Sequence, residues 1–94
     1  MKRCMGCMEV YEEKEQICPY CGYREGTAPK ETYHMIPGSI LYKRYIIGRV
    51  LGFGGFGVTY ISVDLRKQVL MCIKEYNPRD FSYRDPQNPV LLLL

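Results

Sequence analysis

Two pairs of cysteines with metal-ligand spacing stand near the start of the chain. The pairs are Cys4 with Cys7 and Cys18 with Cys21. A Cys-x-x-Cys segment allows one tight turn to present two sulfurs to the same ion, and Zn²⁺ in structural sites takes four tetrahedral ligands. We therefore predict a structural Zn²⁺ site made by these four cysteines, with no open coordination position for catalysis.

Two other uses of the same cysteines remain alternatives. Disulfides require an oxidising compartment, yet no apolar secretion signal follows Lys2 and Arg3. A redox-active Cys-x-x-Cys normally belongs to a βαβ unit and would not normally occur twice. The spacing resembles a zinc ribbon over residues 1–23. Basic and aromatic side chains do not cluster around the cysteines, so we expect a structural or partner-docking role and no contact with nucleic acid.

The residue after each second cysteine determines how regular each metal-binding turn can be. Gly22 follows Cys21, and glycine tolerates the positive φ that turns backbone N–H groups toward the thiolates. Met8 follows Cys7 at the corresponding place in the first pair. We therefore expect the first turn to be the less regular one.

A glycine-rich string is the second group of residues with chemical potential. Gly52, Gly54 and Gly57 have the spacing Gly-x-Gly-x-x-Gly. A dinucleotide fingerprint needs a helix directly after the glycines, and a Walker loop needs Lys followed by Ser or Thr, but the β-branched residues 58–63 follow instead. The remaining design is a strand-turn-strand lid over phosphate oxygens with a lysine on the next strand, and Lys74 stands in that position.

Each of these features also has a simpler explanation. The glycines alone are compatible with a plain β-hairpin, and Lys74 alone with a solvated lysine on a strand. The combination favours a nucleotide lid, because Leu51 precedes the glycines, Val58 follows them, and Ile73 precedes Lys74 at the end of the third apolar run.

With these residues in place, residues 45–76 resemble the start of a protein kinase domain. The run Ile-Lys-Glu-Tyr-Asn-Pro at residues 73–78 is similar to bacterial Ser/Thr kinases of the eukaryotic-like type. The resemblance implies that Lys74 holds the α- and β-phosphates of ATP, with Mg²⁺ in a full-length parent. It places Cys72 against the adenine, where the family usually has alanine, and Leu51 and Val58 on either side of the ring. The implied lid comprises Leu51, Gly52, Phe53, Gly54, Gly55, Phe56, Gly57 and Val58.

The groups that perform kinase chemistry cannot be assigned in this sequence. Phosphotransfer needs an aspartate at the substrate hydroxyl, an asparagine and a second aspartate on Mg²⁺, and a helix glutamate paired with the lysine. Glu75 neighbours Lys74 on one strand, so we expect it on the opposite face. Asp80 and Asp85 lie in proline-broken sequence without the catalytic motifs. We therefore expect a truncated, N-terminal fragment of a Ser/Thr kinase that is inactive alone, with phosphotransfer only in the full-length parent.

Two alternative functions remain open from the sequence. One is a zinc-ribbon adaptor that docks to a protein partner, and the other is a nucleotide-binding regulator without catalysis. Neither the protein substrate nor the docking partner can be named from these residues.

Three β-rich segments must position these groups. They comprise residues 45–51, 58–63 and 68–74, which are joined by the glycine string and by a turn at residues 64–67. The economical arrangement is a three-stranded antiparallel β-meander. We predict a small zinc ribbon at residues 1–23, a linker at residues 24–41 and a partial α+β kinase N-lobe at residues 42–94, mostly β and coil.

The remaining sequence contributes little to function. Prolines interrupt the chain after Tyr76, so we expect at most a short helical turn at residues 79–83, and we expect residues 91–94 to be an edge and not an element. The net charge of +3 is too small and scattered to indicate a nucleic-acid partner. The longest apolar run, residues 90–94, is far shorter than the roughly 20 residues of a membrane helix. We expect a cytoplasmic protein.

Overall fold

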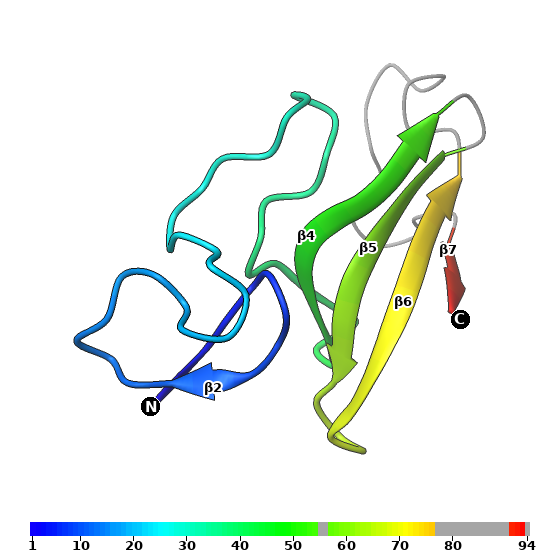
Figure 1. The fold of residues 1–94 in the computed structure, drawn as a ribbon. Helices are drawn as coiled ribbons and strands as arrows, with labels where there is room; N and C mark the ends of the chain where they lie inside the picture. The colour runs from blue at the N-terminus through cyan, green and yellow to red at the C-terminus, as the bar shows by residue number, and fades with distance from the viewer. Residues whose placement is uncertain (55–56, 77–90, 94) are drawn as a thin grey trace.

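The computed structural model describes residues 1–54, 57–76 and 91–93 (Figure 1). These residues form β-strands and turns, and no helix is present among them. The predicted mostly β and coil architecture is therefore confirmed for these ranges, whereas they contain no α part of the expected α+β lobe. The helical turn expected at residues 79–83 lies outside the described residues.

A short antiparallel pair of strands begins the fold. β1 (Lys2–Arg3) pairs with β2 (Val10–Tyr11), so that Lys2 lies opposite Tyr11. The chain between these strands carries the first cysteine pair, and the second pair follows β2. We call residues 1–23 the cysteine module. It lies beside β4 of the larger sheet in Figure 1.

Five antiparallel strands form the main sheet, in the order β3, β4, β5, β6, β7. Their bounds are Ile40–Leu41, Tyr45–Gly54, Gly57–Asp64, Val69–Tyr76 and Leu91–Leu93. The three strands predicted from the sequence correspond to β4, β5 and β6. The meander therefore forms the centre of the sheet, and β3 and β7 extend it at its two edges.

The closing leucines take part in the sheet. β7 pairs with β6, with Leu91 opposite Glu75 and Leu93 opposite Ile73. The expectation that this end of the chain forms no element is therefore wrong for Leu91–Leu93. The reason is that the outer edge of β6 presents a row of backbone N–H and C=O groups, which an added strand can pair.

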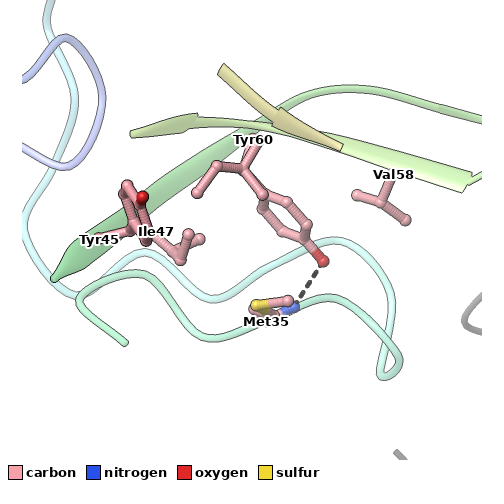
Figure 2. Packing of buried hydrophobic residues seen from close by; sticks show 6 residues of the cluster. Met35, Tyr45, Ile47, Val58 and Tyr60 are labelled. Atoms are coloured by element: carbon pink, nitrogen blue, oxygen red, sulfur yellow. Dashed lines mark hydrogen bonds between the residues drawn. The ribbon is translucent and has the colours of Figure 1, made fainter. Parts of the chain in front are cut away.

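One face of the sheet carries the main hydrophobic core. Ile47, Tyr60 and Ile73, one from each central strand, are fully buried, and Tyr60 lies directly opposite Ile73. Figure 2 shows the Tyr60 ring between Ile47 and Val58, with its hydroxyl directed at Met35. That hydroxyl accepts a 2.9 Å hydrogen bond from the Met35 backbone N–H. The core is therefore closed by a segment that precedes the sheet in sequence.

Residues 24–41, expected to be a linker, supply that closing segment. His34 and Met35 are 3% and 6% exposed. The ring of His34 meets the ring of Phe53 edge to face, with 4.7 Å between their centroids. Part of this stretch therefore packs on the sheet as well as connecting the cysteine module to it.

An ion pair joins the turn before β4 to the end of β5, at the end of the sheet away from the glycines. Arg44 Nε donates to Asp64 Oδ1 at 2.9 Å and its Nη2 donates to Oδ2 at 2.7 Å. Asp64 Oδ1 also accepts from the backbone N–H groups of Arg66 and Lys67. The Arg44 guanidinium and these N–H groups outweigh the effect of burial and lower the pKa of Asp64 to about 2.

Replacing the Asp64 carboxylate tests whether its ion pair with Arg44 stabilises the fold. A folded-state pKa below the ordinary value of 3.8 contributes stability above pH 4, and that contribution is lost as the pH falls from about 4 to about 2. We expect Asp64→Asn to lower the urea midpoint at pH 7, and the difference from the wild type to shrink across that acid range. Denaturation of both proteins at matched pH measures it, with Glu12→Gln as an exposed control. A difference that does not change with pH would contradict the assignment.

The strand β4 is irregular where the cysteine module packs on it. Its register with β5 shifts between Ile47 and Val50 and again between Val50 and Gly52, and β4 is visibly curved in Figure 1. Gly48 lies in the first irregularity. A Cβ there would collide with the Met5 carbonyl oxygen, with Met8 Cε and with Ile61 Cγ2. The close approach of module and sheet therefore depends on a glycine at this position.

A single added methyl group tests this contact. We expect Gly48→Ala to destabilise the fold by about 1–3 kcal/mol, the usual cost of overpacking, because backbone of the module must move. Gly52→Ala is the matched control, since a Cβ at Gly52 has no heavy atom within 4 Å. Chemical denaturation of the metal-loaded chains gives both values. Equal stabilities of the two variants would show that the module does not pack at Gly48.

Candidate metal centre and glycine-rich turn

The four predicted metal ligands meet at one point. Their sulfur atoms all lie within 4.8 Å of one another, with Cys4 Sγ 3.6 Å from Cys21 Sγ and Cys7 Sγ 3.8 Å from Cys18 Sγ. A tetrahedral ion with metal–sulfur bonds of about 2.3 Å requires sulfur separations of about 3.8 Å. The donor set and its spacing therefore fit a four-coordinate thiophilic ion such as Zn²⁺. Among the described residues, no other group of three or more potential ligands comes together in this way.

The two cysteine turns have the same backbone geometry. The N–H of Met8 donates to the Cys4 carbonyl at 2.7 Å, and the N–H of Gly22 donates to the Cys18 carbonyl at 2.9 Å. Their φ angles are also alike, at 71° for Met8 and 81° for Gly22. The expectation that the first turn is less regular is therefore wrong. Met8 adopts the left-handed conformation that glycine prefers, and its side chain, 5% exposed, packs at the sheet and offsets the cost.

Backbone N–H groups point at two of the sulfurs. The N–H of Gly6 donates to Cys4 Sγ at 3.2 Å, and the N–H of Tyr20 donates to Cys18 Sγ at 3.4 Å. Such bonds are stronger when the sulfur is a thiolate, because charge assists them. Both turns are thus built to stabilise negative sulfur in the arrangement that a metal site requires.

The thiols differ in how easily they lose a proton. Burial raises the pKa of Cys4, and it raises the pKa of Cys7 to about 12. Burial also acts to raise the pKa of Cys18. The backbone N–H groups of Tyr20 and Cys21 outweigh it, together with the thiols of the other two cysteines, and the pKa of Cys18 falls to about 7. Burial therefore opposes ionisation of Cys4 and Cys7, whereas backbone N–H groups favour it at Cys18, and a bound cation would stabilise thiolates at this spacing.

The fifth cysteine, Cys72, stands apart from this group on β6 and gives a matched control. We expect the chain to bind one Zn²⁺, and Cys7→Ser to weaken binding by more than the roughly 10- to 100-fold cost of changes outside the ligand shell. Cys72→Ser should leave the affinity unchanged. Competition with a chromophoric chelator measures both. Equal affinities for the two variants would contradict the four-sulfur site.

A separate hollow lies at the glycine-rich turn. Its volume is about 250 Å³, and it is lined by Gly52, Phe53, Gly54, Gly57, Thr59 and Lys74. Thr59 lies directly opposite Lys74 in the β5–β6 register, and the Lys74 ammonium lies 5.2 Å from the centroid of the Tyr76 ring. We call this space the Lys74 hollow. Its lining therefore contains the three glycines of the predicted motif and the predicted lysine.

The register decides which other predicted site residues join that hollow. Cross-strand partners share a face in an antiparallel sheet, so Lys74 and Cys72 lie on the face of Thr59 and Ile61. Val58 pairs with Glu75 on the opposite face and is 1% exposed within the core.

The structure therefore does not bring Val58 together with Cys72 and Lys74. Leu51 is 42% exposed in the irregular part of β4. Gly55 and Phe56 lie outside the described residues.

Glu75 is separated from Lys74, as expected from strand alternation. It is 3% exposed, and the Tyr60 hydroxyl donates to its Oε1 at 3.5 Å. Gly57 also has a specific role here. Its φ is 143°, and a Cβ would collide with the Glu75 carbonyl oxygen, so glycine allows the start of β5 to lie this close to β6.

Two residues at these sites were not identified from the sequence. Thr59 lines the Lys74 hollow, and strand alternation back from Lys74 through the β5–β6 turn could have indicated it. Arg49 contacts the cysteine module from β4. The sequence did contain an indication of this contact. Arg49 is a charged residue directly after Gly48 in the otherwise apolar run at residues 45–51, and a regular buried strand would not carry a charge there.

Comparisons with protein-family models, with curated proteins and with solved structures give no match for this chain. Within the described residues, no helix has the length and apolar character needed to cross a membrane.

Proposed function

We propose that this chain is the metal-stabilised nucleotide-binding segment of a Ser/Thr protein kinase of the bacterial eukaryotic-like type. In this proposal the cysteine module holds Zn²⁺ as a structural ion. The sheet binds ATP through the glycine-rich turn and Lys74, and phosphotransfer belongs to the full-length parent. The observation that carries the proposal is the Lys74 hollow, in which three glycines and one lysine surround a single space.

The chemistry of the hollow suits a polyphosphate. Glycines without side chains leave backbone N–H groups accessible to phosphate oxygens, and an ammonium supplies charge that those oxygens require. Lys74 forms no ion pair with another described residue, and Glu75 on the same strand is buried on the other face. The position of the ammonium beside the Tyr76 ring and in the lining of the hollow supports the proposal that it binds an external anion.

In this proposal the sheet binds the nucleotide and the cysteine module stabilises the fold. Lys74, the glycine backbone and the Thr59 hydroxyl bind and orient the phosphates, and Mg²⁺ bound with ATP would neutralise part of their charge. The four cysteines have no open coordination position, so the metal contributes folding energy and not catalysis. Leu51 and Cys72 remain the proposed adenine contacts from the resemblance, whereas Val58 lies in the core on the opposite face of the sheet.

A charge-removing substitution tests the nucleotide site. We expect Mg-ATP to bind the zinc-loaded chain and Lys74→Met to weaken that binding at least about tenfold, because a charge-assisted contact with phosphate is lost. Lys67→Met, on the exposed β5–β6 turn, is the matched control and should bind as the wild type does. Calorimetric titration with Mg-ATP measures all three. Identical binding by the two variants, or none by the wild type, would contradict the proposal.

The same preparation separates binding from catalysis. We expect the 94-residue chain to transfer no phosphate to a generic protein substrate above the rate of Mg-ATP alone, because the chain offers no catalytic aspartate in the family's motif. Measurable transfer that Lys74→Met abolishes would show a working enzyme. Zinc-dependent capture of a protein partner that Mg-ATP does not alter would favour an adaptor instead.

A further inference from the structure

The first cysteine turn is joined to β4 by one residue, Arg49. The backbone N–H of Arg49 donates to the Met5 carbonyl at 2.8 Å, and its side-chain Nε donates to the Gly6 carbonyl at 2.8 Å. Met5 and Gly6 are the two residues between the ligands Cys4 and Cys7. Both carbonyls that the metal-binding turn presents outward are therefore bound by a single arginine of the sheet.

The irregularity of β4 makes this contact possible. The register shift between Ile47 and Val50 removes the Arg49 N–H from the β5 ladder and leaves it available to Met5. Gly48 gives the Met5 carbonyl room to approach. The bulge and the glycine thus direct a backbone donor of β4 out of its sheet and toward the cysteine turn.

Two hydrogen bonds connect the Cys4 sulfur to Arg49, which precedes the part of β4 that lines the Lys74 hollow. The Gly6 N–H donates to Cys4 Sγ, and the Gly6 carbonyl accepts from Arg49. Three residues after Arg49, Gly52 lines the hollow with Lys74. A bound ion would fix the Cys4 sulfur in place as the acceptor, and would thereby stabilise this orientation of the peptide groups of Gly6.

We propose that Arg49 is a positioning residue that couples metal occupancy of the four cysteines to the backbone of residues 52–54, which line the Lys74 hollow. The metal-loaded turn holds Arg49, Arg49 holds the irregular part of β4, and β4 sets the backbone of residues 52–54, which line the hollow. The ligand affected is a nucleoside triphosphate, so this part rests on the proposed function. Linkage requires the converse, that bound nucleotide tightens metal binding by the same factor.

A purely structural role for Arg49 has a different signature. Loss of a stabilising contact would lower the unfolding midpoint and leave the fold's native geometry at β4 unchanged. Loss of coupling would loosen residues 50–54 while the metal site and the β5–β6 turn keep their protection. The structural role and the coupling role of Arg49 are therefore distinguished by which backbone amides exchange faster in the native state. The free energy of unfolding does not distinguish them.

Hydrogen exchange on the zinc-loaded chain provides the first test. We expect Arg49→Ala to raise exchange at the amides of residues 50–54 at least about fivefold, the lower end of usual coupling factors, with the β5–β6 turn unchanged. Arg66→Ala removes the same charge from that exposed turn and should leave residues 50–54 as in the wild type. Faster exchange throughout the sheet, or none at residues 50–54, would overturn the coupling.

Nucleotide affinity provides the second test and separates this inference from the proposed function. We expect Mg-ATP to bind zinc-loaded Arg49→Ala at least about fivefold more weakly than the zinc-loaded wild type, and bound Mg-ATP no longer to tighten zinc binding in the variant. Equal Mg-ATP affinity in the two proteins would overturn the coupling and leave the proposed function standing. Absence of binding to the wild type would overturn the proposed function, and hydrogen exchange would then decide the coupling alone.

Discussion

The arrangement of four cysteine sulfurs within 4.8 Å is the constraint on which the rest of this structure depends. The buried cluster of the cysteine module consists of Cys4, Tyr11 and Cys18, so two of its three members belong to the candidate metal-binding group. A module with so little apolar surface to bury gains little from the hydrophobic effect. A metal ion bound by the four cysteines would therefore supply much of the stability that the apolar surface cannot, as in other small metal-dependent folds.

The second consequence of this constraint is the form of β4. A regular strand would pair all its backbone groups with β3 and β5, but β4 is out of register at Gly48 and Arg49, where the module approaches. The main core on the other face, around Tyr60 and Ile73, is closed by Met35 of the preceding segment. Residues that come before the sheet in the chain therefore contact it on both faces, the cysteine module at β4 and Met35 at Tyr60 of β5.

The sequence predicts the elements whose cause is local. The Cys-x-x-Cys spacing fixes which sulfurs converge, and the β-branched runs fix β4, β5 and β6 to within a few residues. Strand alternation also places Glu75 away from Lys74 correctly. These features depend on residues that are near one another in the chain, so pattern and propensity are sufficient to find them.

The features that the sequence does not predict arise from contacts between distant segments. Met8 takes a left-handed conformation because its side chain is buried against the sheet, which no local pattern indicates. Val58 lies in the core because register shifts in β4 and the β5–β6 pairing set its face. Pairing of Leu91–Leu93 with β6, and burial of His34 and Met35 from a proline-containing stretch, likewise depend on the finished sheet.

X-ray absorption at the zinc edge of the purified chain tests the metal centre most directly. It reports the number, kind and distance of the atoms bound to the ion, independently of the fold around it. The account predicts four sulfur atoms at about 2.3 Å and no nitrogen or oxygen neighbour. A first shell with fewer than four sulfurs, or with nitrogen or oxygen ligands, would contradict it.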